Sequence, residues 1–148
     1  MIYFSLGVTL SERQKKELLE HDSIAQYVEE ESHISFAEIP EELINSFIKI
    51  FPTPSKVRLT SIAPKETITI AAEESPERKS VIVFPLSENY APFIAKEDDR
   101  VLEVPDMTCY AFNTTLSRTV ENNETRRISL QLWYDMDIAE LHRTMTEG

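Results

Sequence analysis

Apolar residues follow a helical spacing in the first third of the chain and a strand-like alternation in the rest. Ser11 and Gln14 have the spacing of a capping box, which predicts a helix that runs to about Leu19. Asp22 has the character of a second helix cap, and apolar residues three and four apart follow it: Ile24, Tyr27 and Val28. This spacing predicts that helix continues beyond Asp22, either as one kinked helix or as two.

Three further elements are predicted before residue 57. Residues 2–6 alternate weakly and favour a first strand, and residues 33–37 favour a second. Pro40 suits the first turn of another helix, because its fixed φ fits there and its missing N–H is not needed. Pro52 ends that helix.

From residue 57 onward the pattern is typical of strands. Alternating or continuous apolar segments predict strands at residues 57–62, 67–73, 80–86, 91–95, 100–104, 107–113, 117–121 and 126–134. The segment 80–86 is apolar on both faces, which favours a central strand that ends at Pro85. A short helix is expected at residues 137–144.

Helices followed by a meander of strands favour an α+β fold, with the helices packed on one face of an antiparallel sheet. A length of 148 residues is that of a single domain. Within it we expect residues 1–56 to be a mainly helical cover, residues 57–135 to be the β core, and residues 136–148 to be a C-terminal tail or short helix.

Charge and cysteine content exclude several classes of protein. The formal net charge of -11 argues against nucleic-acid and anionic-membrane partners, since both require a basic surface. The single cysteine, Cys109, excludes an internal disulfide and is expected to be a small core residue. No apolar run approaches a membrane span and no signal-peptide pattern is present, so a cytoplasmic protein is expected.

Two segments near the C-terminus resemble a known family. Arg118-Thr-Val-Glu-Asn122, a turn, and then Arg127-Ile-Ser129 are similar to the C-terminal hairpin of the iron- and 2-oxoglutarate-dependent oxygenases. Residues 59–71 and 100–113 resemble upstream strands of the same family. The resemblance implies a double-stranded β-helix, which is a jelly-roll barrel of eight strands related to the cupins.

The same resemblance implies a degenerate metal site. The positions of the family's two histidines and one acidic ligand fall on Ala71, Arg118 and Glu73, and of these only Glu73 can bind a metal. The chain's three histidines, His21, His33 and His142, lie outside these strands. We therefore expect no bound metal or cofactor, and we expect Glu73 and Arg118 to form an ion pair in the former metal site.

The resemblance also implies that the carboxylate-binding end of the family's pocket is retained. The resemblance implies that Arg127 and Ser129 bind the distal carboxylate of a 2-oxoglutarate-like ligand. Period two then places the following residues inside the barrel: Arg127, Ser129, Gln131 and Trp133, together with Thr67, Thr69, Ala71 and Glu73. The alternate residues of the last strand, from Ile128 to Tyr134, should pack on the N-terminal helices.

Three functions follow as alternatives. The first is a catalytically inactive oxygenase-like module that binds a small dicarboxylate or a protein partner. The second is an active iron- and 2-oxoglutarate-dependent oxygenase with atypical ligands. The third is a structural scaffold that forms a homo-oligomer. The missing histidines favour a protein that is not an enzyme.

Overall fold

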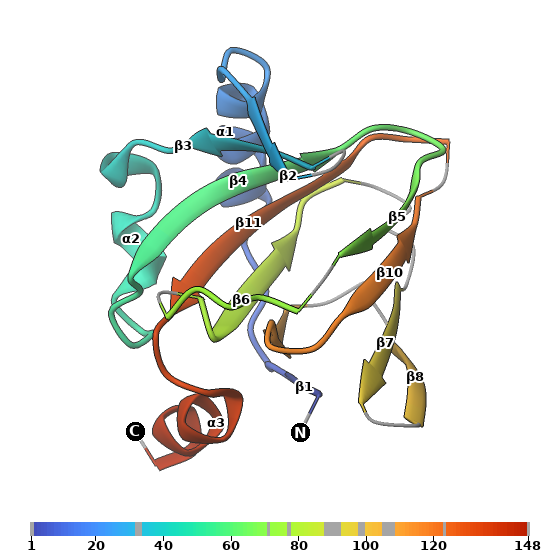
Figure 1. Cartoon of the computed structure of the whole chain (residues 1–148). Helices are drawn as coiled ribbons and strands as arrows, with labels where there is room; N and C mark the ends of the chain where they lie inside the picture. The colour runs from blue at the N-terminus through green and yellow to red at the C-terminus, as the bar shows by residue number, and fades with distance from the viewer. Residues whose placement is uncertain are drawn as a thin grey trace.

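Two antiparallel sheets face each other in the computed structural model of the protein (Figure 1). The structure describes residues 2–31, 34–70, 72–76, 78–87, 93–97, 100–104, 109–122 and 124–147. The larger sheet has the strand order β1 (Tyr3–Ser5), β9 (Tyr110–Asn113), β6 (Ser80–Pro85), β11 (Arg127–Tyr134), β4 (Lys56–Ile62), β3 (Ile34–Glu38) and β2 (Val28–Glu31). The smaller sheet has the order β5 (Thr67–Ile70), β10 (Arg118–Glu121), β7 (Phe93–Glu97) and β8 (Arg100–Val104).

This arrangement confirms the predicted α+β class and the double-stranded β-helix. The eight strands from β4 to β11 correspond one by one to the eight predicted segments, and β7 and β8 form the expected hairpin. Strand β6 lies between β9 and β11 and ends at Pro85, as its apolar pattern predicted. The start of the segment predicted at 107–113 lies outside the described residues.

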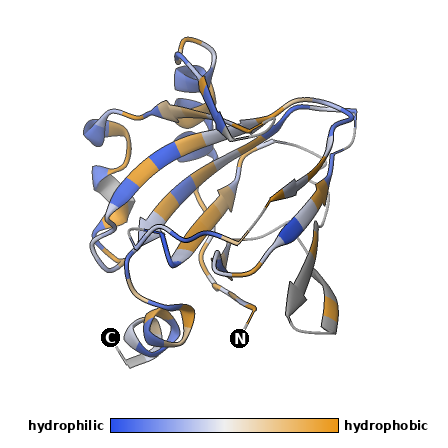
Figure 2. Cartoon of the chain, viewed as in Figure 1, coloured by the Kyte–Doolittle hydropathy of each residue, from blue (hydrophilic) through white to orange (hydrophobic). Residues whose placement is uncertain are grey.

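Helices cover the outer face of the larger sheet. These are α1 (Glu12–Asp22), the 3₁₀ helix η1 (Glu41–Leu43), α2 (Asn45–Ile48) and α3 (Ile138–Glu147). Leu18 of α1 and Leu141 of α3 are buried in one cluster with Leu59, Leu130 and Leu132 of the sheet. Blue and orange positions alternate along β4 in Figure 2, which is the pattern of a strand whose two faces have different surroundings.

A second apolar cluster lies between the two sheets. It includes Ile62 and Val83 from the larger sheet, and Ile68 and Val120 from the smaller one. The space between the sheets is therefore a second core, separate from the helix-side core. The candidate site lies within it.

The capping box is confirmed, but the helix predicted after Asp22 is wrong. The Ser11 hydroxyl accepts from the Gln14 N–H at 3.1 Å, and the Gln14 side chain accepts from the Ser11 N–H at 2.8 Å. Helix α1 ends at Asp22, and the chain turns into strand β2 from Val28 onward.

Tertiary contacts of Asp22 explain the end of α1. Its nearly buried carboxylate accepts from both terminal nitrogens of Arg126 and from the Tyr27 hydroxyl, so it holds the loop against the residue that precedes β11. Ile24 is 77% exposed, so the apolar spacing that predicted a second helix does not mark a buried face. Residues 1–56 were predicted to be mainly helical, but the described part of this segment also supplies β1, β2 and β3.

The helix predicted from Pro40 is also shorter than expected. Pro40 is extended and precedes η1, and the helix is divided into η1 and α2. Among the described residues no helix is both long and apolar enough to cross a membrane. The cytoplasmic location and the single-domain organisation stay predictions.

We expect Leu130→Ala to lower the free energy of unfolding by about 2–5 kcal/mol, because it opens a cavity in the helix-side core. Ile24→Ala is the matched control, since it removes an exposed aliphatic side chain and should cost about 0.5 kcal/mol or less. Urea unfolding of both variants measures the difference. Equal losses in the two variants would contradict this placement of the core.

Candidate anion-binding site

Strand β11 supplies one wall of the site. Ile128, Leu130, Leu132 and Tyr134 are buried in the helix-side core, which confirms the predicted face of this strand. Arg127, Ser129 and Gln131 point the other way and line a cavity between the sheets. Trp133, on the same face, packs against the inter-sheet core. The sequence alternation therefore assigned the two faces of β11 correctly.

The predicted faces of β5 are wrong. Ile68 is buried and Ile70 lines the cavity, whereas Thr67 and Thr69 are exposed. The Thr69 hydroxyl lies 3.3 Å from that of Thr119 on the outer face. Burying the two isoleucines removes more apolar surface from water than burying the two threonines would, and this decides the face.

Because the isoleucines of β5 face inward, an aliphatic side chain lies opposite Arg118. In the antiparallel register Arg118 pairs with Ile70, and both residues line the cavity. The predicted ligand position Ala71 lies outside the described residues. Strand β5 ends at Ile70, and Ala72 and Glu73 lie outside any strand, so the strand predicted to continue to Glu73 is too long.

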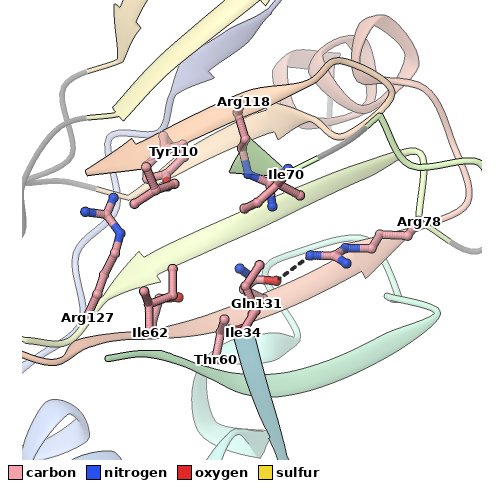
Figure 3. Close-up of a pocket in the computed structure, with 11 residues that line it drawn as sticks. Ile34, Thr60, Ile62, Ile70, Arg78, Tyr110, Arg118, Arg127 and Gln131 are labelled. Carbon is pink, nitrogen blue, oxygen red and sulfur yellow. Dashed lines mark hydrogen bonds between the residues drawn. The ribbon is translucent and has the colours of Figure 1, made fainter. Parts of the chain in front are cut away.

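Three arginines surround one cavity of about 30 Å³ (Figure 3). Arg78 comes from the loop before β6, Arg118 from the start of β10, and Arg127 from the start of β11. Their exposed fractions are 3%, 9% and 4% respectively. Figure 3 shows them on different sides of the cavity. The described lining contains no acidic side chain, although the carboxylate of Glu73, outside the lining, pairs with Arg78.

The remaining lining is partly apolar and partly polar. Four aliphatic side chains form the apolar part, namely Ile34, Ile62, Ile70 and Val120. Uncharged polar side chains add hydrogen-bonding groups, namely Thr60, Tyr110, Ser129 and Gln131. Pockets that bind small ligands commonly combine an apolar lining with a few polar groups in this way.

Arg78 is fixed by several contacts. Its Nη2 donates to Gln131 Oε1 at 3.3 Å, and its Nη1 donates to Glu73 Oε2 at 3.4 Å. Its guanidinium lies 4.3 Å from the centroid of the Trp133 ring, a cation–π distance. The Trp133 indole N–H donates to the same Gln131 oxygen at 3.2 Å. The only tryptophan of the chain is therefore coupled to the cavity wall.

Glu73 pairs with Arg78 instead of with Arg118, so the predicted pair is replaced. The Glu73 carboxylate also accepts from the Ser75 N–H at 3.1 Å. The Arg118 guanidinium lies 5.1 Å from the centroid of the Phe112 ring. Glu73 follows the end of β5. Its backbone N–H donates to the Thr114 carbonyl at 2.8 Å, a bond that is not part of the pairing between β5 and β10.

The described residues do not fit an iron ion. Iron(II) takes imidazole and carboxylate ligands, but the described lining offers neither and presents three permanent cations. No group of three or more potential metal ligands occurs among the described residues. His21 contacts the Glu38 carbonyl and His142 packs on Phe4, both away from the cavity, while His33 lies outside the described residues.

Thr60 is a buried polar residue of the wall that the motifs did not identify. It is 5% exposed, and within the described part of the chain its hydroxyl has no hydrogen-bond partner. It lies directly opposite Ser129 in the β4–β11 register. Extending the two-residue alternation of β11 to the neighbouring strand β4 would have identified Thr60 as a residue of the same face. Arg78 had no such signal, because it lies in a loop without periodicity.

Comparisons with known proteins identify the fold. No protein-family model matches the sequence, and no curated protein matches it. Solved structures do match. An oxidoreductase of the 2OG-Fe(II) oxygenase family from Burkholderia pseudomallei superposes with a TM-score of 0.66 at 12% identity, over 91% of this chain and 85% of that one.

Two prolyl hydroxylases match in the same way. The Trichoplax adhaerens enzyme gives a TM-score of 0.66 at 12% identity, over 95% of this chain and 86% of that one. The Pseudomonas putida prolyl-4-hydroxylase gives a TM-score of 0.61 at 12% identity, over 90% of this chain and 91% of that one. This chain has the fold of the 2OG-Fe(II) oxygenases. In this oxygenase fold the described cavity is lined by arginines and not by metal ligands.

Cys109 belongs to the helix-side core of this oxygenase fold, as predicted, and not to the cavity. Burial raises the pKa of its thiol, so the thiol stays protonated and unreactive at neutral pH. We expect iodoacetamide at pH 8 to label the native protein at least about tenfold more slowly than the urea-unfolded protein. Since there is one cysteine, mass spectrometry reads the site directly. Equal labelling rates would contradict its burial.

We expect Thr60→Val to raise the free energy of unfolding by about 1 kcal/mol in buffer without polyvalent anions, because it removes a buried hydroxyl that has no partner. The neighbouring variant Ser61→Ala is the control and should be destabilising, since the Ser61 hydroxyl accepts from Arg126 Nε at 2.7 Å. Urea unfolding measures both. A destabilising Thr60→Val would show that the hydroxyl is satisfied in the native protein.

Proposed function

We propose that this protein is a catalytically inactive module of the oxygenase fold that binds a small carboxylate or similar anion without a metal. One observation carries the proposal. Three buried guanidinium groups surround a single cavity whose described lining contains neither a carboxylate nor a metal ligand. Guanidinium groups placed in this way can donate charge-assisted hydrogen bonds to an anion in the cavity.

Arg127 and Ser129 are the first contacts that we propose for the anion. Both are buried on the cavity face of β11, two residues apart and therefore side by side along the wall. A planar guanidinium donates two parallel hydrogen bonds to a carboxylate, and a serine hydroxyl donates a third. The rigid central strand that carries both residues holds this arrangement in place.

The proposed inactivity rests on the donor set. A 2-oxoglutarate oxygenase needs iron, whose chemistry the described cavity residues cannot support, because guanidinium groups repel a cation and carry no lone pair to donate. The fold alone does not supply an activity. A homo-oligomer or a protein partner stays a prediction, since nothing in the structure concerns either.

We expect oxalate or 2-oxoglutarate alone to raise the melting temperature, because an anion that binds only the folded state stabilises it. At 100 times Kd the gain is about 2.7 kcal/mol. The fluorescence of Trp133 should change in parallel, since Arg78 and Gln131 contact both the indole and the cavity. Arg127→Gln should abolish both responses.

Arg13→Gln is the matched control, because it removes the same charge from a side chain on α1 that is 89% exposed. It should respond as the unmodified protein does. Manganese(II) should add nothing to the shift. A stabilisation that needs manganese and 2-oxoglutarate together would refute the metal-free proposal and favour an active oxygenase. No response to any anion would favour a scaffold.

A further inference from the structure

We propose that Thr60 is a ligand-contacting residue of the site, and that its hydroxyl donates a hydrogen bond to the same carboxylate group that Arg127 and Ser129 hold. This inference rests on the proposed function and deepens it, because it makes the ligand a carboxylate and adds a neutral donor from a second strand. The sequence motifs assigned no role to Thr60.

The Thr60 hydroxyl is the observation that points to a ligand. The residue is 5% exposed, and within the described part of the chain its oxygen has no hydrogen-bond partner. An unsatisfied polar group in a protein interior costs folding free energy and is uncommon in native structures. Valine has nearly the shape of threonine without the hydroxyl and is favoured in strands, so the fold alone does not require threonine here. A ligand that accepts from the hydroxyl accounts for it.

The register of the sheet places this hydroxyl beside the proposed carboxylate position. Thr60 on β4 lies directly opposite Ser129 on β11, and both residues line the cavity (Figure 3). Side chains that are directly opposite in an antiparallel pair have Cβ atoms about 4.5–5.5 Å apart. On its other side Thr60 pairs with Phe36 of β3, whose ring carries no oxygen or nitrogen. One small ligand group can therefore reach the two hydroxyls together.

A carboxylate matches the number of these donors. An ionised carboxylate has two oxygens and accepts about four hydrogen bonds. The Arg127 guanidinium can supply two parallel N–H donors, and because it carries five N–H groups it can do so alongside other contacts. The hydroxyls of Ser129 and Thr60 can supply one donor each. Together the three side chains provide the donors that one carboxylate takes.

The size of the cavity fits the same group. A volume of about 30 Å³ accommodates about two to three water-sized groups. A carboxylate group has three non-hydrogen atoms, so the cavity can take this end of a ligand. Ile34 and Ile62 line the same cavity, and hydrogen bonds to a bound group are stronger in such surroundings of low dielectric than in water.

Isothermal titration of the full chain with acetate, oxalate and sulfate, at neutral pH and constant ionic strength, tests the inference. Acetate has one carboxylate and no other polar group, so it reports the contact directly. Thr60→Val should weaken acetate and oxalate by about tenfold, because a hydrogen bond to a charged group is lost. Thr60→Ser keeps the hydroxyl and should bind both within about threefold of the unmodified protein. Sulfate has no carboxylate and should bind more weakly than oxalate.

Thr67→Val is the matched control, because it removes the same hydroxyl from an exposed position on β5. It should leave the affinity for each anion unchanged. Unchanged affinity in Thr60→Val, or an equal loss in Thr60→Ser, would refute the contact and leave the hydroxyl to an enclosed water. Tighter binding of sulfate than of oxalate would overturn the carboxylate. If Arg127→Gln leaves the binding of every anion unaffected, the proposed function itself is refuted.

Urea unfolding provides a second readout that a purely structural role would not change. Without ligand, Thr60→Val should be more stable than the unmodified protein, because an unsatisfied hydroxyl is lost. In oxalate at 100 times the Kd of the unmodified protein the order should reverse, since a tenfold weaker affinity removes about 1.4 kcal/mol of stabilisation by the ligand. A stability difference that is the same with and without oxalate would overturn the role of Thr60.

Discussion

The alternation of side chains along β11 is the constraint on which the rest of the structure depends. This strand is the middle one of the larger sheet and pairs along its length with β4 and β6. Leu130 and Leu132 face the helices, while Arg127 and Ser129 face the smaller sheet. A shift of one residue in register would place an arginine in the helix-side core and a leucine in the cavity. Both cores therefore fix the register of β11, and this register determines where Arg127 and Ser129 lie.

Much of this organisation can be read from the sequence, and the exceptions have physical causes. The β core was predictable because its strands carry apolar residues at period two or in continuous runs, as in 80–86 and 126–134. The helix predicted after Asp22 failed because that carboxylate is bound by Arg126, more than a hundred residues away in the chain. Local spacing carries no information about such a contact.

The misassigned face of β5 has a different cause. Thr67 to Ile70 alternate perfectly, so the pattern defined two faces but not which one is inside. The resemblance to the oxygenases placed the threonines inside, whereas burial of apolar area placed the isoleucines there. This assignment affects the site, because Ile70 lines the cavity and pairs with Arg118 in the register. Similarity of fold at 12% identity thus preserves the strands while the residues at individual positions follow local energetics.

The arginine-lined cavity lies inside a protein with a formal net charge of -11, and the two facts are compatible. Exposed charges are screened over about 8 Å at physiological ionic strength, so the acidic surface acts weakly on an anion that has reached the cavity. The buried arginines interact in a less polar medium and are screened much less. For the proposed anion, long-range repulsion would slow the approach, whereas the local guanidinium groups would determine how firmly it is held. Added salt should therefore affect the rate of association and the affinity in opposite ways: screening the surface raises the rate, while competition by salt anions for the cavity lowers the apparent affinity.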